Sequence, residues 1–498
     1  MSDRIDAIEL SEDIRGDEVK ADLQGAYKSV YFDSTKDMGE ALDKVSPSFC
    51  LAKWFNVSIH IPTGRTHSCY HPPVHRIPME ELEADPSALH NTKHKKKQRE
   101  MMLKGERPKE CSFCWDIEDT GNISDRPYRS FDVNEPGIIA EALKYGSDGN
   151  PLPKYMEVNF NQACNFKCTY CSPHLSTEWH KEIRKHGPYK MEHGNHNDTS
   201  WMEKDGMLPN NRPDNPYLKA FWEYFPEAYP NLQTFRMTGG EPLMDKNTFK
   251  IFDYVKKNPS KKLHLSITSN CNPPKQELWD NFISDLKEIT DARAIDHFML
   301  FCSLDSWGKQ AEYIRPGMDF DVLHKNIRTF LTDSECHSLT FIATMNILSL
   351  PGWMKYITNI YNLRNEINTD RQLIWFDTPM LHDPRWMSLK LATPEMLQPL
   401  LDSIMFMEEN KETQSNRFKG FKDYEIDKVR RLYEWAREPM DERNTLLAKK
   451  NFALYFKQKD ERQGTNIKET FPEFETFIEE CERLAWQNRD YTTINSIL

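Results

Sequence analysis

From about residue 154 to residue 376, short apolar runs alternate with stretches whose apolar residues recur every three or four positions. The short runs are typical of buried strands, and the longer repeat is typical of amphipathic helices. Strands that alternate with helices pair in parallel, because each helix carries the chain back along the sheet. The expected strands are 155–160, 232–237, 262–268, 298–304, 339–345 and 373–376. This pattern predicts an α/β fold that suits an incomplete barrel, with chemistry at the carboxyl ends of the strands.

A loop with three cysteines follows the first expected strand. Its thiols belong to Cys164, Cys168 and Cys171. Three thiolates cannot close a four-iron cluster, which takes four ligands. They leave one iron with an open position, where a metal site performs chemistry rather than supporting a fold. Two other interpretations stay open at this point: a zinc site with His174 as its fourth ligand, or free thiols in the core.

The three-then-two spacing of these cysteines resembles the signature of the radical S-adenosylmethionine (SAM) superfamily. A second motif agrees, because Gly239-Gly240-Glu241-Pro242 follows the second expected strand and is similar to a Gly-Gly-Glu-Pro motif of that family. The resemblance implies a partial (β/α)6 TIM-like barrel, a [4Fe-4S] cluster on the three cysteines, and SAM at the open iron. It also implies reductive cleavage of SAM to a 5'-deoxyadenosyl radical, which abstracts hydrogen from a substrate.

The same resemblance assigns SAM contacts by position. Tyr170 would border the adenine, and the turn from Gly239 to Pro242 would receive the SAM ammonium group. The remaining contacts would come from Ser303 and Asp305 for the ribose hydroxyls, Asn346 near the adenine and ribose, and Arg315 for the carboxylate. Simpler interpretations exist for each, since paired glycines make ordinary turns, Asp305 can cap a helix, and Arg315 can pair with an acid.

A second group of cysteines lies upstream, at Cys50, Cys69, Cys111 and Cys114. Residues 55–61 alternate like a strand and Gly64 marks a turn, so a hairpin is expected to bring the first two together. Four thiolates can close a cluster completely. The pattern resembles the SPASM and twitch modules, which hold an auxiliary [4Fe-4S] cluster, although in the familiar enzymes the module follows the barrel. A structural zinc site with four cysteines is the alternative.

These motifs divide the chain into expected regions. The regions are an N-terminal extension (1–40), a twitch-like module (41–150), the barrel (151–390) with an insertion (173–230), and a helical C-terminal region (391–498). The formal net charge of -12 offers no basic field for nucleic acid, and no apolar run approaches the roughly 20 residues of a membrane span. The polar, acidic N-terminus is unlike a signal peptide. We therefore expect a cytoplasmic protein without membrane or nucleic-acid partners.

The expected activity is that of a radical SAM enzyme with an external one-electron reductant such as flavodoxin or ferredoxin. The resemblance favours a peptide or protein substrate, and a small metabolite, sugar or nucleotide is the alternative. A different class of protein also fits some features, namely a non-catalytic interaction protein with a four-cysteine metal site. The joint presence of the three-cysteine loop and Gly239-Gly240-Glu241 favours catalysis, because a degenerate barrel has no need of both.

Overall fold

A computed structural model of the chain describes residues 17–333, 337–367 and 370–487. Residues 1–16 of the expected extension and 488–498 of the expected helical region lie outside this description. The fold is mixed α/β, and it divides into two compact units. Unit 1 comprises Met1–Val158 and Arg212–Phe235, and unit 2 comprises Asn159–Asn211 and Arg236–Leu498.

Unit 1 is largely helical and carries a short antiparallel hairpin. Its strands β1 (Asn56–His60), β2 (Arg65–His67) and β3 (His75–Arg76) pair antiparallel in that order. The turn between β1 and β2 has Gly64 at φ 60°, where an added Cβ would lie 2.2 Å from the ring of Tyr217. Only glycine fits that turn, because it accepts positive φ and has no side chain. The hairpin expected between Cys50 and Cys69 is thus confirmed.

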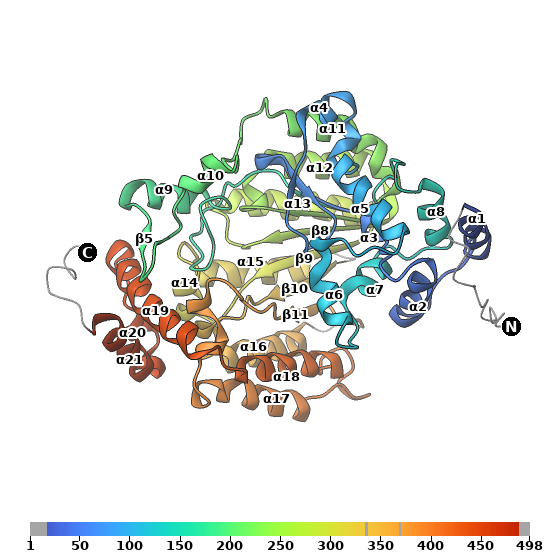
Figure 1. Ribbon diagram of the computed structural model, residues 1–498. Coiled ribbons are helices and arrows are strands. Elements are labelled where there is room, and N and C mark those ends of the chain that lie inside the picture. Colours follow the sequence, from blue (N-terminus) through green and yellow to red (C-terminus); the bar gives the residue numbers. More distant parts are fainter. Residues whose placement is uncertain (1–16, 334–336, 368–369, 488–498) are drawn as a thin grey trace. The chain divides into compact units, whose positions relative to one another are not determined.

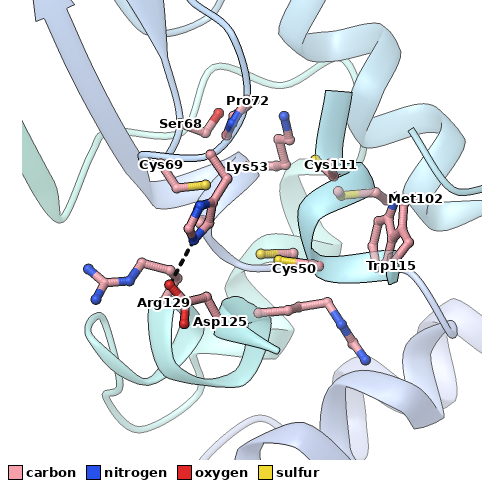
Figure 2. Close-up of a pocket in the computed structure, with 14 residues that line it drawn as sticks. Cys50, Lys53, Ser68, Cys69, Pro72, Met102, Cys111, Trp115, Asp125 and Arg129 are labelled. Atoms are coloured by element: carbon pink, nitrogen blue, oxygen red, sulfur yellow. Dashed lines mark hydrogen bonds and ion pairs between the residues drawn. The ribbon is translucent and has the colours of Figure 1, made fainter. Parts of the chain in front are cut away.

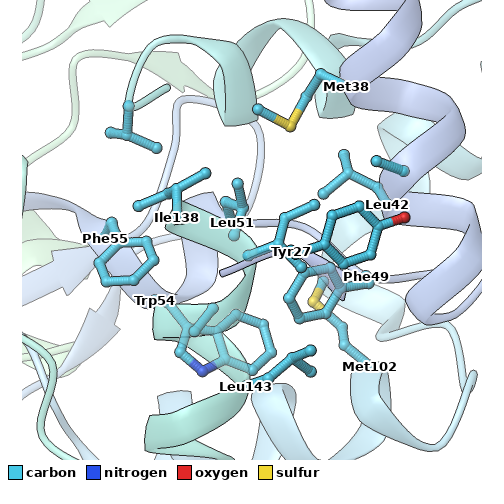
Figure 3. Packing of buried hydrophobic residues seen from close by; sticks show 14 of the residues in the cluster. Tyr27, Met38, Leu42, Phe49, Leu51, Trp54, Phe55, Met102, Ile138 and Leu143 are labelled. Atoms are coloured by element: carbon cyan, nitrogen blue, oxygen red, sulfur yellow. The ribbon is translucent and has the colours of Figure 1, made fainter. Parts of the chain in front are cut away.

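Helices of unit 1 enclose one hydrophobic cluster, shown in Figure 3. Its members include the fully buried Leu42, Phe49 and Trp54, and the Trp54 indole N–H donates to the carbonyl oxygen of Gly146 at 2.8 Å. A buried indole needs such a partner, because an unpaired N–H is costly away from water. The helices of unit 1 as a whole are α1 (Asp17–Ala26), α2 (Thr35–Val45), α3 (Ala52–Phe55), α4 (Met79–Ala84), α5 (Lys93–Leu103), α6 (Ser112–Glu118), α7 (Asp125–Phe131), α8 (Ile138–Tyr145) and α11 (Pro216–Ala228).

Unit 2 contains four neighbouring strands that all run parallel: β8 (Ser260–Ser269), β9 (Ile295–Ser303), β10 (His337–Ile342) and β11 (Ile374–Asp377). Strands β4 (Tyr155–Asn159) and β7 (Thr234–Thr238) each continue from unit 1 into unit 2. All six expected strands are therefore confirmed. In the register, Ser269 lies opposite Cys302 and Ile342 opposite Ser303, so the carboxyl ends of neighbouring strands coincide. No pairing among the described strands of unit 2 closes a ring.

Helices follow β7, β8, β9 and β10, as the apolar repeat predicts (Figure 1). The helices are α12 (Lys246–Lys257), α13 (Gln276–Asp291), α14 (Lys309–Ile314), α15 (Phe320–Asp333) and α16 (Trp353–Glu366). In α12 the buried residues Ile251, Phe252 and Val255 share one face. The Asp245 side chain caps this helix by accepting from the Asn247 N–H at 2.7 Å.

The insertion and the C-terminal region of unit 2 lie against each other. The insertion holds α9 (Thr177–His186), β5 (Tyr189–Lys190), β6 (Asn195–His196) and α10 (Ser200–Lys204). The C-terminal helices are α17 (Gln398–Glu409), α18 (Asp423–Arg437), α19 (Glu442–Gln463), α20 (Ile467–Thr470) and α21 (Glu475–Trp486). The Gln458 side chain of α19 bonds to both backbone groups of Lys190, at 2.9 and 2.8 Å. The helical character expected here is confirmed.

Among the helices of the described residues, none combines the length and the apolar character that crossing a bilayer requires.

Candidate functional site

The cysteine loop, residues 161–171, follows β4 and is fixed by backbone hydrogen bonds to residues 314–316 at the end of α14. The Lys167 N–H donates to the Pro316 oxygen at 2.8 Å, and the Thr169 N–H donates to the Ile314 oxygen at 2.9 Å. These bonds resemble a short ladder, although the segments are far apart in the sequence. The loop is consequently held in one conformation by its surroundings as well as by its own residues.

The Gly-Gly-Glu-Pro turn, after β7, lies directly on the cysteine loop. The Gly240 N–H donates to the Asn161 oxygen at 3.2 Å, and the Glu241 N–H donates to the Ala163 oxygen at 2.6 Å. A Cβ on Gly240 would lie 2.3 Å from that Ala163 oxygen, and Gly239 has φ 130°. Both glycines are therefore required by the close approach of two backbones. The sequence indicated this freedom, but assigned it to contact with a ligand.

The Glu241 carboxylate is fully engaged inside the protein. It accepts from the Ser269 hydroxyl at 2.8 Å, from the Asn270 N–H at 2.7 Å and from the Leu243 N–H at 3.0 Å. Burial raises the pKa of Glu241 to about 7 even though these hydrogen bonds lower it. The side chain thus joins the turn after β7 to the end of β8. The ammonium group of a ligand would therefore need other acceptors.

Asparagines join the cysteine loop to the same end of β8. The Asn165 amide donates to the Asn272 oxygen at 2.8 Å, and its own oxygen accepts from the Asn270 amide at 2.9 Å. Sequence reasoning did not single out these three residues. The available signal was the position of Asn270 and Asn272 just after an expected strand, where functional side chains of parallel sheets gather.

A buried network of charged and phenolic groups surrounds Cys168. Arg315 donates from Nε and Nη2 to the two carboxylate oxygens of Asp305, at 2.8 and 2.9 Å. Its Nη2 also donates to the Tyr170 hydroxyl at 2.5 Å, and its Nη1 donates to Cys168 Sγ at 3.4 Å. The Asp305 carboxylate further accepts from the Thr344 N–H at 2.8 Å. The structure therefore brings Tyr170, Asp305 and Arg315 together, and it directs Arg315 toward a cysteine.

Two other residues that the resemblance assigned to SAM lie at strand ends. Ser303 is the last residue of β9. Asn346, after β10, is fully buried and caps the turn η6 (Ile347–Ser349). Its amide donates to the Thr344 oxygen at 2.9 Å and its oxygen accepts from the Leu348 N–H at 3.1 Å. The Asn346 side chain is thus used by the local turn.

The three thiols are half-buried and lie close enough together to affect one another's pKa. Burial and the neighbouring Cys168 raise the pKa of Cys164, and the same two causes raise the pKa of Cys171 to about 12. Burial also raises the pKa of Cys168, whereas the positive charge of Arg315 acts to lower it. His174, the zinc alternative's fourth ligand, bonds through Nδ1 to the Ser172 hydroxyl at 2.6 Å. Within the described ranges, no three His, Cys, Asp or Glu side chains converge at coordinating distance.

The insertion and the C-terminal region both contact the backbone of the cysteine loop. The Trp179 indole of α9 donates to the Cys168 oxygen at 2.9 Å, and the Tyr455 hydroxyl of α19 donates to the Thr169 oxygen at 3.2 Å. Both aromatic residues are fully buried. Two regions for which the sequence indicated no role therefore support the loop.

Two polar atoms beside the loop are left over. Asn159 Oδ1 and Gln162 Oε1 are buried, and neither has a hydrogen-bond partner among the residues that the structure describes. Buried acceptors of this kind are normally paired, so each could accept a hydrogen bond from a bound group. Together with three thiols, this donor set fits an iron–sulfur cluster and a ligand that carries an ammonium group.

The four upstream cysteines line one pocket of unit 1 (Figure 2). Cys50 precedes α3, Cys69 follows β2, Cys111 ends the turn η3 (Lys109–Cys111) and Cys114 lies in α6. All four are free thiols. Burial raises the pKa of Cys111 and of Cys114 to about 12. Among the lining residues, His71 Nε2 and Asp125 Oδ2 form a hydrogen bond at 2.7 Å. The four cysteines that the sequence grouped therefore line the same pocket, and their role as metal ligands stays a prediction.

A buried cation faces this pocket. Lys53 is 3% exposed and pairs with Glu110, which His94 also contacts at 2.6 Å. Burial lowers the pKa of Lys53, but Cys111 and Glu110 outweigh this and raise it, so the side chain is positively charged. Burial raises the pKa of Glu110, but His94 and Lys53 bring it down to about 2. A fixed positive charge beside four thiols suits a metal centre whose ligands are thiolates.

Comparison with known proteins adds no relative: no protein-family model matches the chain, and no curated sequence matches it.

Proposed function

We propose that this chain is a radical SAM enzyme, with residues 151–390 forming a partial (β/α)6 barrel. The observation that carries the proposal is the direct bonding of the turn at Gly240 and Glu241 to the cysteine loop at Asn161 and Ala163. Two motifs that are separate in the sequence, and that resemble one family, thereby form one site at the carboxyl ends of parallel strands.

In this site Cys164, Cys168 and Cys171 would hold a [4Fe-4S] cluster, and SAM would take the open position. When bound, the cluster and SAM supply a low-potential electron and a carbon radical that removes hydrogen from a C–H bond. The chain's own residues bind and orient these groups. Asn159 Oδ1 and Gln162 Oε1 are the free acceptors suited to the SAM ammonium, because Glu241 is engaged elsewhere.

The protein also keeps the cysteine loop rigid and excludes water from it. The backbone of the loop is bonded to residues 314–316, to Trp179 and to Tyr455, and these aromatic side chains are fully buried. A rigid surrounding shell keeps reacting groups in place and excludes water that would quench a radical. No acid–base pair is needed for hydrogen abstraction itself.

The upstream pocket would hold an auxiliary [4Fe-4S] cluster on Cys50, Cys69, Cys111 and Cys114. The charge of Lys53 beside these thiols supports a thiolate-ligated centre, and it suits iron–sulfur and zinc alike. An electron partner such as flavodoxin or ferredoxin would reduce the enzyme. The substrate class that the resemblance favours is a peptide or protein.

Iron content and SAM cleavage in a cysteine variant test the proposal. After anaerobic reconstitution, Cys168→Ala should bind about four irons fewer per chain than the native protein and should form no 5'-deoxyadenosine. Cys481→Ala is the matched control, because Cys481 is a buried thiol of α21 outside both groups. Native iron content and turnover in Cys168→Ala would reject the proposal.

A further inference from the structure

We propose that Arg315 is a positioning residue that sets the reduction potential of the cluster on Cys164, Cys168 and Cys171, by donating a charged hydrogen bond to Cys168 Sγ. This inference rests on the proposed function. It differs from the role that sequence resemblance gave Arg315, which was contact with the SAM carboxylate.

The geometry leaves Arg315 little freedom for another role. The Arg315 side chain is 7% exposed, and its Nε and Nη2 donate to the Asp305 carboxylate at 2.8 and 2.9 Å. A further N–H is taken by the Tyr170 hydroxyl at 2.5 Å and another by Cys168 Sγ at 3.4 Å. Of the five N–H donors of an arginine, four are thus engaged inside the protein.

The supporting residues fix the direction of the bond to sulfur. Asp305 is fully buried and is itself held by the Thr344 N–H at 2.8 Å. A planar guanidinium gripped by a carboxylate cannot rotate, so its Nη1 must point along one line. The buried, ordered ion pair thereby places one charged donor on one thiol. The low dielectric of the interior strengthens this interaction.

A charged donor on a ligand sulfur favours the reduced cluster, which carries one more negative charge. Hydrogen bonds to the sulfurs are among the factors that set the potential of such clusters. Loss of Arg315 should therefore make the cluster harder to reduce. Arg315→Lys keeps the positive charge and loses the guanidinium geometry, so its potential should lie between those of the native protein and Arg315→Gln.

The test is a potentiometric titration of the full-length, reconstituted protein, followed by EPR. The signal to follow is the one that SAM perturbs, which separates this cluster from the upstream one. In Arg315→Gln, the ratio of reduced to oxidised cluster at a fixed potential should fall about tenfold, a midpoint about 59 mV lower. In Arg315→Lys the midpoint should lie between the native and the Arg315→Gln values.

The matched control is Arg364→Gln. Arg364 is a buried arginine of the same unit that pairs with Glu425 at 2.5 Å. This variant should lose stability and keep the native potential, so a shift caused by general loosening is recognised. Equal potentials in Arg315→Gln and the native protein would overturn the inference.

Each remaining outcome is also decisive. If Arg315→Gln takes up no cluster, Arg315→Lys carries the test, and a native midpoint in that variant refutes the role. If the native protein itself binds no iron on these cysteines, the proposed function fails and the inference fails with it. Iron that is retained in Arg315→Gln but lost in Cys168→Ala shows that the site exists, whatever the potential.

Discussion

The backbone N–H of Glu241 donates to the carbonyl oxygen of Ala163 at 2.6 Å, which places the Gly-Gly-Glu-Pro turn on the cysteine loop. The glycine before it permits the contact, since any larger residue would meet the same oxygen. This one relationship explains why both motifs occur in the chain. The predictions below follow from it and from the two groups of cysteines.

Replacement of Gly240 by alanine should displace the cysteine loop. The new Cβ would lie 2.3 Å from the Ala163 oxygen, so one of the two backbones must move. We expect the free energy of unfolding to fall by about 2 kcal/mol and the iron content after reconstitution to drop. Denaturant titration and iron assay measure these changes. Gly25→Ala is the control, because nothing lies within 4 Å of its added Cβ, and it should keep native iron. A fully loaded, stable Gly240→Ala protein would contradict the contact.

The pH dependence of stability should contain a contribution from Glu241. Burial raises the pKa of its carboxyl from 4.5 to about 7 in the folded chain. The folded state therefore binds this proton more tightly than the unfolded state, and the stabilisation is complete below the unfolded pKa. It is lost as pH rises through about 7, by on the order of 3 kcal/mol. Urea titrations from about pH 5 to pH 8 should show a shallower decline in Glu241→Gln than in the native chain. Parallel curves would show that the carboxyl is not perturbed.

Cys111→Ala tests whether the upstream pocket holds a metal, and which one. If the pocket holds an auxiliary cluster, this variant binds about four irons fewer per chain and keeps the EPR signal that SAM perturbs. If it holds zinc, the variant loses zinc and its iron content is unchanged. Metal analysis of the native chain and of Cys111→Ala distinguishes these cases. Cys481→Ala is again the buried-thiol control. A variant that retains all its metal would show that Cys111 is not a ligand.

The sequence predicted local features well, because they depend on short patterns. All six strands were recognised from apolar runs, and the hairpin before Cys69 was recognised from alternation and Gly64. The grouping of Cys50 with Cys111 came from the resemblance to a cysteine module, and both residues line one pocket.

Long-range polar pairs could not be predicted in the same way. The bonds from Arg315 to Asp305 and to Cys168 link separate strands and loops, and nothing in the spacing specifies which partner an arginine takes. The contact of Tyr455 with Thr169 is similar, because α19 reads only as an amphipathic helix and its partner depends on tertiary packing. Such pairs are where the structure changed the roles expected from resemblance.

The most direct test of radical SAM chemistry is metal and sulfide analysis of the anaerobically reconstituted full chain, with EPR spectra recorded with and without SAM. The proposed function predicts a reducible four-iron cluster whose signal changes when SAM is added, with about eight irons per chain if the upstream pocket also holds a cluster. A protein that binds no iron after reconstitution, or a cluster that is indifferent to SAM, would contradict it.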